Sequence, residues 1–498
     1  MMTNSETGST AEKKNILQEV KYIPTGSEKD EPFQPEDEIK RSDTLFLQFT
    51  VMTALLIFMV GGTTIVWTSP AIVKMKSNDS SINPLGRPIQ TYEISKFMGI
   101  VGILALGGSL VLPKLADVMG RKRSLWIMAF FMFVGIVGLG LSRSVNVMII
   151  CSTIIALFFG GAMGILPMYL TEICEDHNRT KYGCLMSAFI PIGQLYTYLI
   201  GPVFSYTVFT ILTAVPMIPF LVMFFFAPES PVYSLEHGNK EECSRALKKL
   251  RSNKTETELD NDLRKISKAL ETTNKTEGNS VGKLFGTKEG RVGMLLSLLP
   301  LFVQYFSGVP VLMMLMAPIF NNSGSFISGS TIGVCVGVVK IILFTTTSLI
   351  VERFGRRPLL LISAGGAALP VSLLGLYFYL KQMNSPFVYQ YPWIPLVCVL
   401  TFVSFYSIGL GPIPITVMGE MFSADTRSTG CAIVTTISSM ALTIYVSAYP
   451  ILAELVGTHW CMWMFGTCCF GGALLIYFLL PETKGKSVVE IQEILKNY

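Results

Sequence analysis

The chain has 498 residues, of which 50% are hydrophobic and only 15% are charged, and its formal net charge is +5. Soluble domains normally carry about 25% charged residues, so the composition excludes an ordinary water-soluble protein. The basic residues fall mainly in loops between apolar segments, which is typical of membrane proteins, and we see no nucleic-acid-binding pattern in them.

Residues 1–43 come first and are polar, with both signs of charge in the stretch EKDEPFQPEDEIKR. They contain no apolar core that could support a fold. We therefore expect a disordered cytosolic tail.

About twelve apolar segments follow, each near the ~20 residues that a helix needs to cross a bilayer. They are too long and too uniformly apolar for the alternating strands of a membrane barrel. Their approximate positions are 45–67, 94–113, 124–142, 147–170, 183–204, 207–227, 292–320, 326–350, 358–380, 394–422, 429–452 and 460–480. The sequence predicts an all-α membrane protein with twelve transmembrane helices.

A polar stretch divides these segments six and six. Its apolar residues recur at spacings of three and four in EECSRALKKLRS and ELDNDLRKISKALE, which predicts short amphipathic helices outside the membrane. We therefore divide the chain into a tail (1–43), an N-terminal half (44–231), a linker (232–291), a C-terminal half (292–480) and a cytosolic C-terminal tail (481–498).

Basic residues gather in alternate loops and in the linker, which favours a cytosolic location for the linker and both termini. The glycosylation sequons at Asn78 and Asn321 then lie outside the cell, and we predict that they carry glycans.

The two halves repeat short motifs in the same order. DVMGRKR (117–123) returns as ERFGRRP (352–358), the pair Glu172 and Arg179 returns as Glu420 and Arg427, and PES (228–230) returns as PET (481–483). Two pseudo-symmetric six-helix halves are typical of transporters that bind substrate between the halves near the middle of the membrane.

The repeated motifs lie at the cytosolic ends of the predicted helices. We predict that they form a gate whose network links the halves and closes the cytosolic side; the alternative is that these charges only fix the topology. The predicted gate residues are Asp117, Gly120, Arg121, Glu172, Arg179, Glu229, Glu352, Gly355, Arg356, Glu420, Arg427 and Glu482.

These motifs resemble the sugar porter family of the major facilitator superfamily, as do LADVMGRKR, PMYLTEICEDHNR, PESPVYSL, GLGPIPITVMGEMF and PETKGKS. The stretch WTSPAIVKM (67–75) is most similar to insect facilitated trehalose and glucose transporters. The resemblance covers nearly the whole membrane region. It implies a major facilitator fold, a plasma-membrane location and alternating-access transport of a sugar, without a cofactor.

The resemblance also implies where the sugar site lies, and this chain departs from the family there. Gln304 matches a family glutamine, whereas Tyr305 replaces a second one, Ser187 another, and Lys340 and Ser438 replace asparagines. Ile415 stands where the family has tryptophan. We expect these six residues to contact substrate, and because amides read sugar hydroxyls, their loss makes an ordinary hexose specificity doubtful.

Lys340 is the most unusual of these residues because it lies in the middle of an apolar segment. It comes twelve residues before Glu352, about 18 Å along a helix, and no acidic residue lies mid-span to pair with it. We expect it to face a water-filled cavity, to be held by backbone carbonyls, to be neutral, or to meet an anionic ligand.

The sequence thus favours a facilitative carrier for a hexose, trehalose or polyol. Family proton symporters have an aspartate where this chain has Thr63, which favours a uniporter. The alternatives are a non-transporting nutrient sensor on the same fold, or a carrier of an organic anion through Lys340. We find no set of residues that indicates an enzyme or a metal site, and we expect a monomer in the lipid bilayer.

Overall fold

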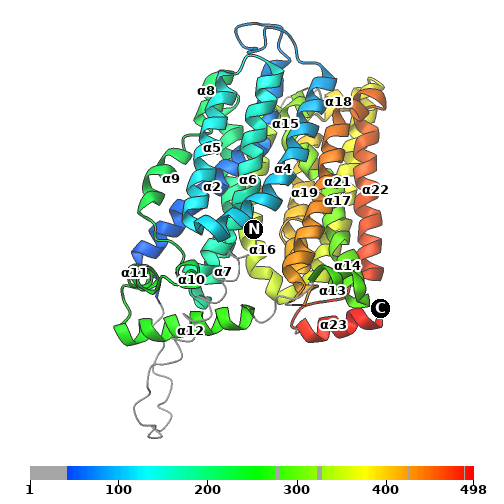
Figure 1. The fold of residues 1–498 in the computed structure, drawn as a ribbon. Coiled ribbons are helices and arrows are strands. Elements are labelled where there is room, and N and C mark those ends of the chain that lie inside the picture. The colour runs from blue at the N-terminus through cyan, green and yellow to red at the C-terminus, as the bar shows by residue number, and fades with distance from the viewer. Residues whose placement is uncertain (1–41, 275–279, 322–327, 424, 487) are drawn as a thin grey trace, which may run out of the picture.

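The structure is a computed structural model that describes residues 42–274, 280–321, 328–423, 425–486 and 488–498. These residues form helices and loops, with no strand among them. Twelve helical segments are long and apolar enough to cross a membrane, and they lie in two bundles of six with the polar linker between them in the chain (Figure 1). This arrangement confirms the predicted fold class. Most of the predicted N-terminal tail, residues 1–41, lies outside the described residues.

The N-terminal half contains the first six spans. Its helices are α2 (Leu45–Val66), α3 (Thr68–Met75), α4 (Thr91–Met119), α5 (Arg121–Leu141), α6 (Val145–Ile173), α7 (Asp176–Ile200), α8 (Tyr206–Leu212), α9 (Met217–Met223) and the 3-10 helix η1 (Phe224–Phe226). The first span consists of α2 and α3, and the sixth of α8, α9 and η1.

The C-terminal half contains the other six spans. Its helices are α14 (Lys288–Phe306), α15 (Val309–Asn321), α16 (Gly329–Phe354), α17 (Arg356–Gln382), α18 (Pro386–Gln390), α19 (Ile394–Ile408), α20 (Ile413–Glu420), α21 (Arg427–Leu455) and α22 (Thr458–Leu479). The seventh span consists of α14 and α15, and the tenth of α19 and α20.

The seventh span breaks for a local reason. Gly308 has φ +90°, a conformation that residues with a side chain rarely adopt, and a Cβ there would lie 2.1 Å from the ring of Phe465. The tenth span breaks at Gly409 and resumes as α20, which has a proline in its first turn. Interrupted helices of this kind are where transporters of this plan place their binding sites.

The linker helices lie at one end of the two bundles, which we call the linker end (Figure 1). They are α10 (Pro231–Glu236), α11 (Lys240–Leu250), α12 (Glu256–Asn274) and α13 (Ser280–Gly286). Cys243 and Leu247 of α11 pack on Leu259 of α12, while Leu284 of α13 packs on Phe422 of the C-terminal half. The linker is therefore shared between the two halves.

The predicted C-terminal tail contains one more helix, α23 (Val488–Asn497), at the same end. Ile491 and Leu495 are buried, and the Gln492 amide donates to the carbonyl oxygen of Met421 at 2.9 Å. The sequence reading missed this helix.

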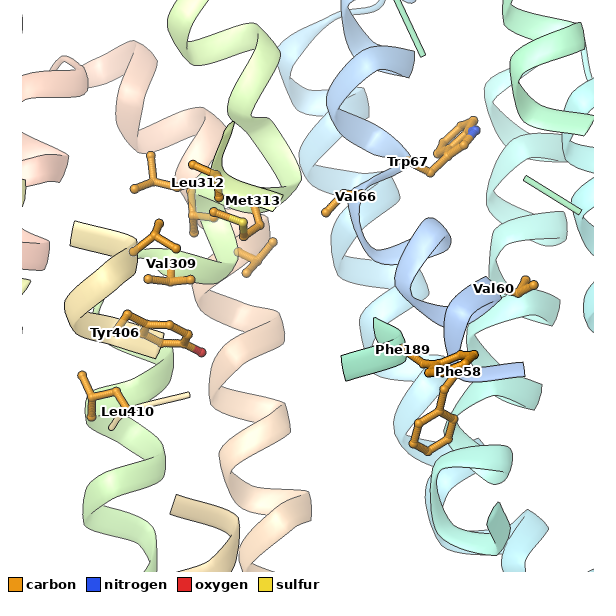
Figure 2. Close-up of a cluster of buried hydrophobic side chains, with 14 of the residues drawn as sticks. Phe58, Val60, Val66, Trp67, Phe189, Val309, Leu312, Met313, Tyr406 and Leu410 are labelled. Carbon is orange, nitrogen blue, oxygen red and sulfur yellow. The ribbon is translucent and has the colours of Figure 1, made fainter. Parts of the chain in front are cut away.

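The buried apolar side chains of the two halves belong to one continuous cluster. Figure 2 shows Val309, Leu312, Met313, Tyr406 and Leu410 gathered on one side and Phe58, Val60, Trp67 and Phe189 on the other. The first group comes from α15, α19 and the turn after it, and the second from α2, α7 and the junction between α2 and α3. The two groups are the parts that the two halves contribute to this cluster.

Candidate substrate site and gate

Three hydrogen bonds join the halves toward the end opposite the linker, which we call the opposite end. The Thr68 hydroxyl donates to the carbonyl oxygen of Met314 at 2.8 Å, and the Tyr198 hydroxyl to that of Met313 at 2.7 Å. The backbone N–H of Ala317 donates to the Ser69 hydroxyl at 2.9 Å. All three bonds bind α15 to the N-terminal half.

Glycines let the helices of the two halves approach closely at this end. A Cβ on Gly333 would lie 2.5 Å from the Tyr198 ring, and one on Gly337 would lie 3.1 Å from Leu195. On the other side of the molecule, a Cβ on Gly102 would lie 2.4 Å from Thr443. Helices α7 and α16, and likewise α4 and α21, therefore pack against each other across the boundary between halves.

Lys340 forms a fourth bond between the halves. Its ammonium donates to Oε1 of Gln194 at 3.0 Å and lies 5.5 Å from the centre of the Phe344 ring, and the residue is only 8% exposed. Lys340 has no ion pair within the described residues. A side-chain amide thus holds the ammonium, an arrangement that the sequence reading did not consider.

Gln304 is buried in the C-terminal half. Its Nε2 donates to the hydroxyl of Tyr406 at 3.3 Å and to the carbonyl oxygen of Gly411 at 2.9 Å. A Cβ on Gly411 would lie 2.6 Å from the Phe344 ring, the same ring that Lys340 contacts. Gln304 and Lys340 are therefore connected through Gly411 and the Phe344 ring, which pack against each other.

The other predicted substrate residues differ in exposure. Ile415 is 60% exposed and Tyr305 is half-buried. Ser438 is fully buried, and its hydroxyl donates to the carbonyl oxygen of Val434 within its own helix at 2.6 Å. The Ser438 hydroxyl therefore donates its proton within α21 rather than toward a ligand.

Ser187 is exposed on α7, and its hydroxyl lies 3.3 Å from the Gly183 carbonyl oxygen. Gln194 follows seven residues later and so lies on the same helix face, two turns away. We missed Gln194 in the sequence, although an amide two turns from a predicted substrate residue was a usable signal.

The predicted gate residues of the N-terminal half lie together at the linker end. The Arg121 guanidinium is 3.2 Å from Glu172, 3.6 Å from Asp117 and 3.9 Å from Glu236, which the sequence reading missed. The Arg121 side chain is nearly buried, so these contacts are partly shielded from solvent.

Gly120 begins the tight turn into α5. Its φ is +95°, and a Cβ there would lie 2.4 Å from Oε2 of Glu229. The other Glu229 oxygen accepts the backbone N–H groups of Lys122 at 2.9 Å and Ser230 at 3.0 Å. A carboxylate thus caps the positive end of α5.

The C-terminal half repeats this glycine turn and carboxylate cap at the start of α17. Gly355 has φ +90°, and Glu482 accepts the N–H groups of Arg356 and Arg357, each at 3.0 Å. The Arg356 guanidinium contacts Glu420 at 2.9 Å. The motif repeat seen in the sequence thus corresponds to a repeated contact.

The remaining gate predictions fall at the same end. Arg179 is exposed, and its guanidinium donates to the Thr171 carbonyl oxygen at 3.3 Å; Arg427 is exposed at the start of α21. The side chain of Glu352 lies outside the described residues. The ion pairs of Arg121 and Arg356 stay within one half or its neighbouring linker helix. That the gate residues link the halves stays a prediction.

A second cluster at the linker end, which the sequence reading missed, attaches the linker to the N-terminal half. Lys254 lies 2.6 Å from Glu175 and 2.9 Å from Asp262, and Arg251 lies 3.4 Å from Glu175 and 2.5 Å from Asp262. We call these four residues the linker clasp. Ser42 extends it, because its backbone N–H donates to Glu175 at 3.2 Å.

The linker clasp is nearly buried and its formal charges cancel. Burial alone would raise the pKa of Asp262, but hydrogen bonds and charge from Lys254 and Arg251 lower it. Burial alone would lower the pKa of Lys254, but Glu175 and Asp262 raise it. Each ionised group is therefore stabilised by its partners.

Asn78 and Asn321, the predicted glycosylation sites, are both exposed. Asn78 lies in the loop between α3 and α4, and Asn321 is the last residue of α15, where its Oδ1 accepts the N–H of Gly329 at 2.8 Å. Both lie at the opposite end.

Comparisons with known proteins agree with this architecture. A family model described as sugar (and other) transporter matches residues 41–495. A facilitated trehalose transporter Tret1-2 homolog from Drosophila simulans is 29% identical over 466 residues, which cover 92% of this chain and 92% of that protein. The facilitated trehalose transporter Tret1 of Anopheles gambiae is 28% identical, and the match covers 92% of this chain but 58% of that longer protein.

Among solved structures, the inward open conformation of the xylose transporter XylE from E. coli matches with a TM-score of 0.75 and 20% identity. The match covers 90% of this chain and 99% of that one. At this identity the likeness speaks for the fold. The family model, which spans most of the chain, leads to one conclusion: the chain belongs to the sugar (and other) transporter family.

Proposed function

We propose that the protein carries a sugar across the plasma membrane by alternating access, with the linker end in the cytosol and the opposite end outside. The observation that carries this proposal is the asymmetry between the two ends. Side-chain hydrogen bonds join the halves toward the opposite end, whereas the described ion pairs at the linker end stay within one half and its linker helices. A carrier open toward the linker end has this pattern of contacts.

The substrate class is inferred from polar side chains of α7 and of the seventh span. Gln194 and Gln304 are amides, which both donate and accept hydrogen bonds, and Tyr305 offers a hydroxyl and an aromatic face. These groups suit a neutral hydroxylated ligand. Together with the trehalose transporters among the relatives, they support trehalose, a hexose or a polyol as cargo.

We further propose that transport is not coupled to protons and that the carrier works as a monomer. Thr63 is buried in the first span, and its hydroxyl donates to the Val60 carbonyl oxygen at 2.7 Å. A threonine hydroxyl does not ionise at physiological pH, so it cannot carry a coupled proton as an aspartate carboxylate at this position would.

The test is uptake of labelled trehalose, glucose and sorbitol into proteoliposomes that contain the purified protein. We expect saturable uptake that a pH gradient leaves unchanged. A Gln304→Leu variant, which loses the buried amide of the seventh span, should raise KM at least roughly tenfold. Absence of uptake across the panel would refute the proposal, and ligand binding without uptake would indicate a sensor instead.

A further inference from the structure

In the described part of the chain, Lys340 and Gln194 form the one hydrogen bond between side chains that we find between α16 and α7. The ammonium of one half donates to the amide oxygen of the other at 3.0 Å, and both residues are buried. We call this contact the Lys340–Gln194 bridge.

The ammonium depends on this acceptor. A lysine in the middle of a membrane span is costly unless its charge is stabilised, and an ammonium without an acceptor loses the hydrogen bonds that it makes in water. Within the described residues, Lys340 has one hydrogen-bond acceptor, Gln194, and one ring contact, Phe344. Breaking the bridge therefore requires a replacement environment for the ammonium, and the water that enters when the halves separate provides one.

The bridge forms only while the halves are close. Gly333, Gly337 and Lys340 follow one another at spacings of four and three, so they share one face of α16. Tyr198 and Leu195 of α7 pack on the two glycines, and Gln194 adjoins Leu195 in the sequence. Any rotation that opens the opposite end separates these two faces and breaks the bridge with them.

The same amide oxygen is the group that would accept a sugar hydroxyl. Gln194 lies two turns from Ser187 on one face of α7, and its Oε1 is engaged by Lys340 in this conformation. A hydroxyl donates to a carbonyl oxygen as an ammonium does. Lys340 and a hydroxylated ligand therefore compete for one acceptor.

We propose that the Lys340–Gln194 bridge holds the opposite end closed and that substrate breaks it by taking the place of the ammonium on Gln194. The inference rests on the proposed sugar transport for the identity of the competing ligand. Lys340 is then a positioning residue that couples ligand binding to opening. A ligand without a hydrogen-bond donor cannot displace the ammonium, so the bridge also contributes to specificity.

The first measurement is the separation of the halves at the opposite end. Spin labels replace Lys76 and Tyr389, two exposed residues of that end in different halves, in a variant whose native cysteines are substituted. Lys340→Met keeps the length of the side chain but removes its charge, and it should populate longer distances in the absence of sugar. Lys340→Arg keeps a cationic donor and should retain the short distance. Lys381→Met, a lysine at the end of α17 outside the bridge, is the matched control and should change nothing.

The second measurement separates competition from a structural role. Lys340→Met should lower the KM for sugar about tenfold, the fold-change expected when a hydrogen bond to a charged group no longer competes with the ligand. Gln194→Leu should open the opposite end as Lys340→Met does but raise KM, because it removes the acceptor from both competitors. A merely structural effect would move KM in the same direction in both variants.

Each outcome decides one proposal. If the wild-type protein transports sugar and Lys340→Met changes neither the distances nor KM, the bridge proposal is overturned. If no sugar in the panel is transported, the proposed function fails, and the distance measurement alone supports the bridge or refutes it.

Discussion

Replacing Asp262 by asparagine should loosen the linker helices α11 and α12 from the N-terminal half. In the linker clasp, Glu175 and Asp262 balance Arg251 and Lys254. The substitution leaves two cations with one carboxylate at a place where the Arg251 and Lys254 side chains are only 9% and 6% exposed. Removing one partner of a buried ion pair costs about 3–5 kcal/mol, and because the Asp262 side chain retains 11% exposure we expect about 3 kcal/mol.

Hydrogen exchange of the α11 and α12 amides, measured in detergent micelles at neutral pH, reads this free energy directly. A loss of about 3 kcal/mol corresponds to exchange roughly 150-fold faster in these helices, with the membrane spans unchanged. Combining Asp262→Asn with Lys254→Met restores the charge balance and should recover part of the protection. The control is Glu256→Gln, which removes an exposed ion pair with Lys248 and should have little effect. Unchanged exchange in Asp262→Asn would show that the clasp does not hold the linker.

Two further predictions concern the linker end. Gly120→Ala should destabilise the protein by about 2 kcal/mol, because alanine is strained at φ +95° and its Cβ would meet Glu229. The apparent Tm in micelles checks this prediction. The control is Gly365→Ala, whose Cβ would meet nothing within 4 Å and which should leave Tm equal or higher. The linker clasp should be stable over a wide pH range. The lowered pKa of Asp262 gives stability that is present above its unfolded value near 4 and is lost as pH falls through the folded value. The raised pKa of Lys254 gives stability that is present below about 10.5 and is lost as pH rises through the folded value. Protection of α12 against exchange, corrected for the intrinsic rate, should therefore be flat from about pH 5 to pH 9, and a steep change inside that range would contradict the assignment.

The membrane architecture was predictable because its signals are local. Long apolar runs specify spans without reference to the rest of the fold, and the repeat of GRK and GRR with PES and PET identified the pairs Gly120 with Glu229 and Gly355 with Glu482 as corresponding positions. Their backbone contacts at the two helix starts follow from that repeat.

The remaining features depend on contacts between distant segments. Gln194 becomes notable only because Lys340, 146 residues away, donates to it. Helix α23 is short, and its apolar residues Ile491 and Leu495 make sense only against the C-terminal half. The linker clasp joins a loop residue, Glu175, to charges in the linker that look like ordinary solvated residues in the sequence. The assignment of the six substrate residues stays a prediction.

The two capping glutamates also constrain how the protein is made. Glu229 follows the sixth span and Glu482 follows the twelfth. Each nevertheless binds the start of the third span of its own half, which is α5 for Glu229 and α17 for Glu482. During synthesis the N-terminal half can complete its linker end before the C-terminal half exists. The C-terminal half must wait for Glu482, which follows its last span and is therefore synthesised after the helix that it caps. The cap of α17 therefore forms only after all six spans of its half have been made, and a truncation just before residue 482 should act on biogenesis before it acts on transport.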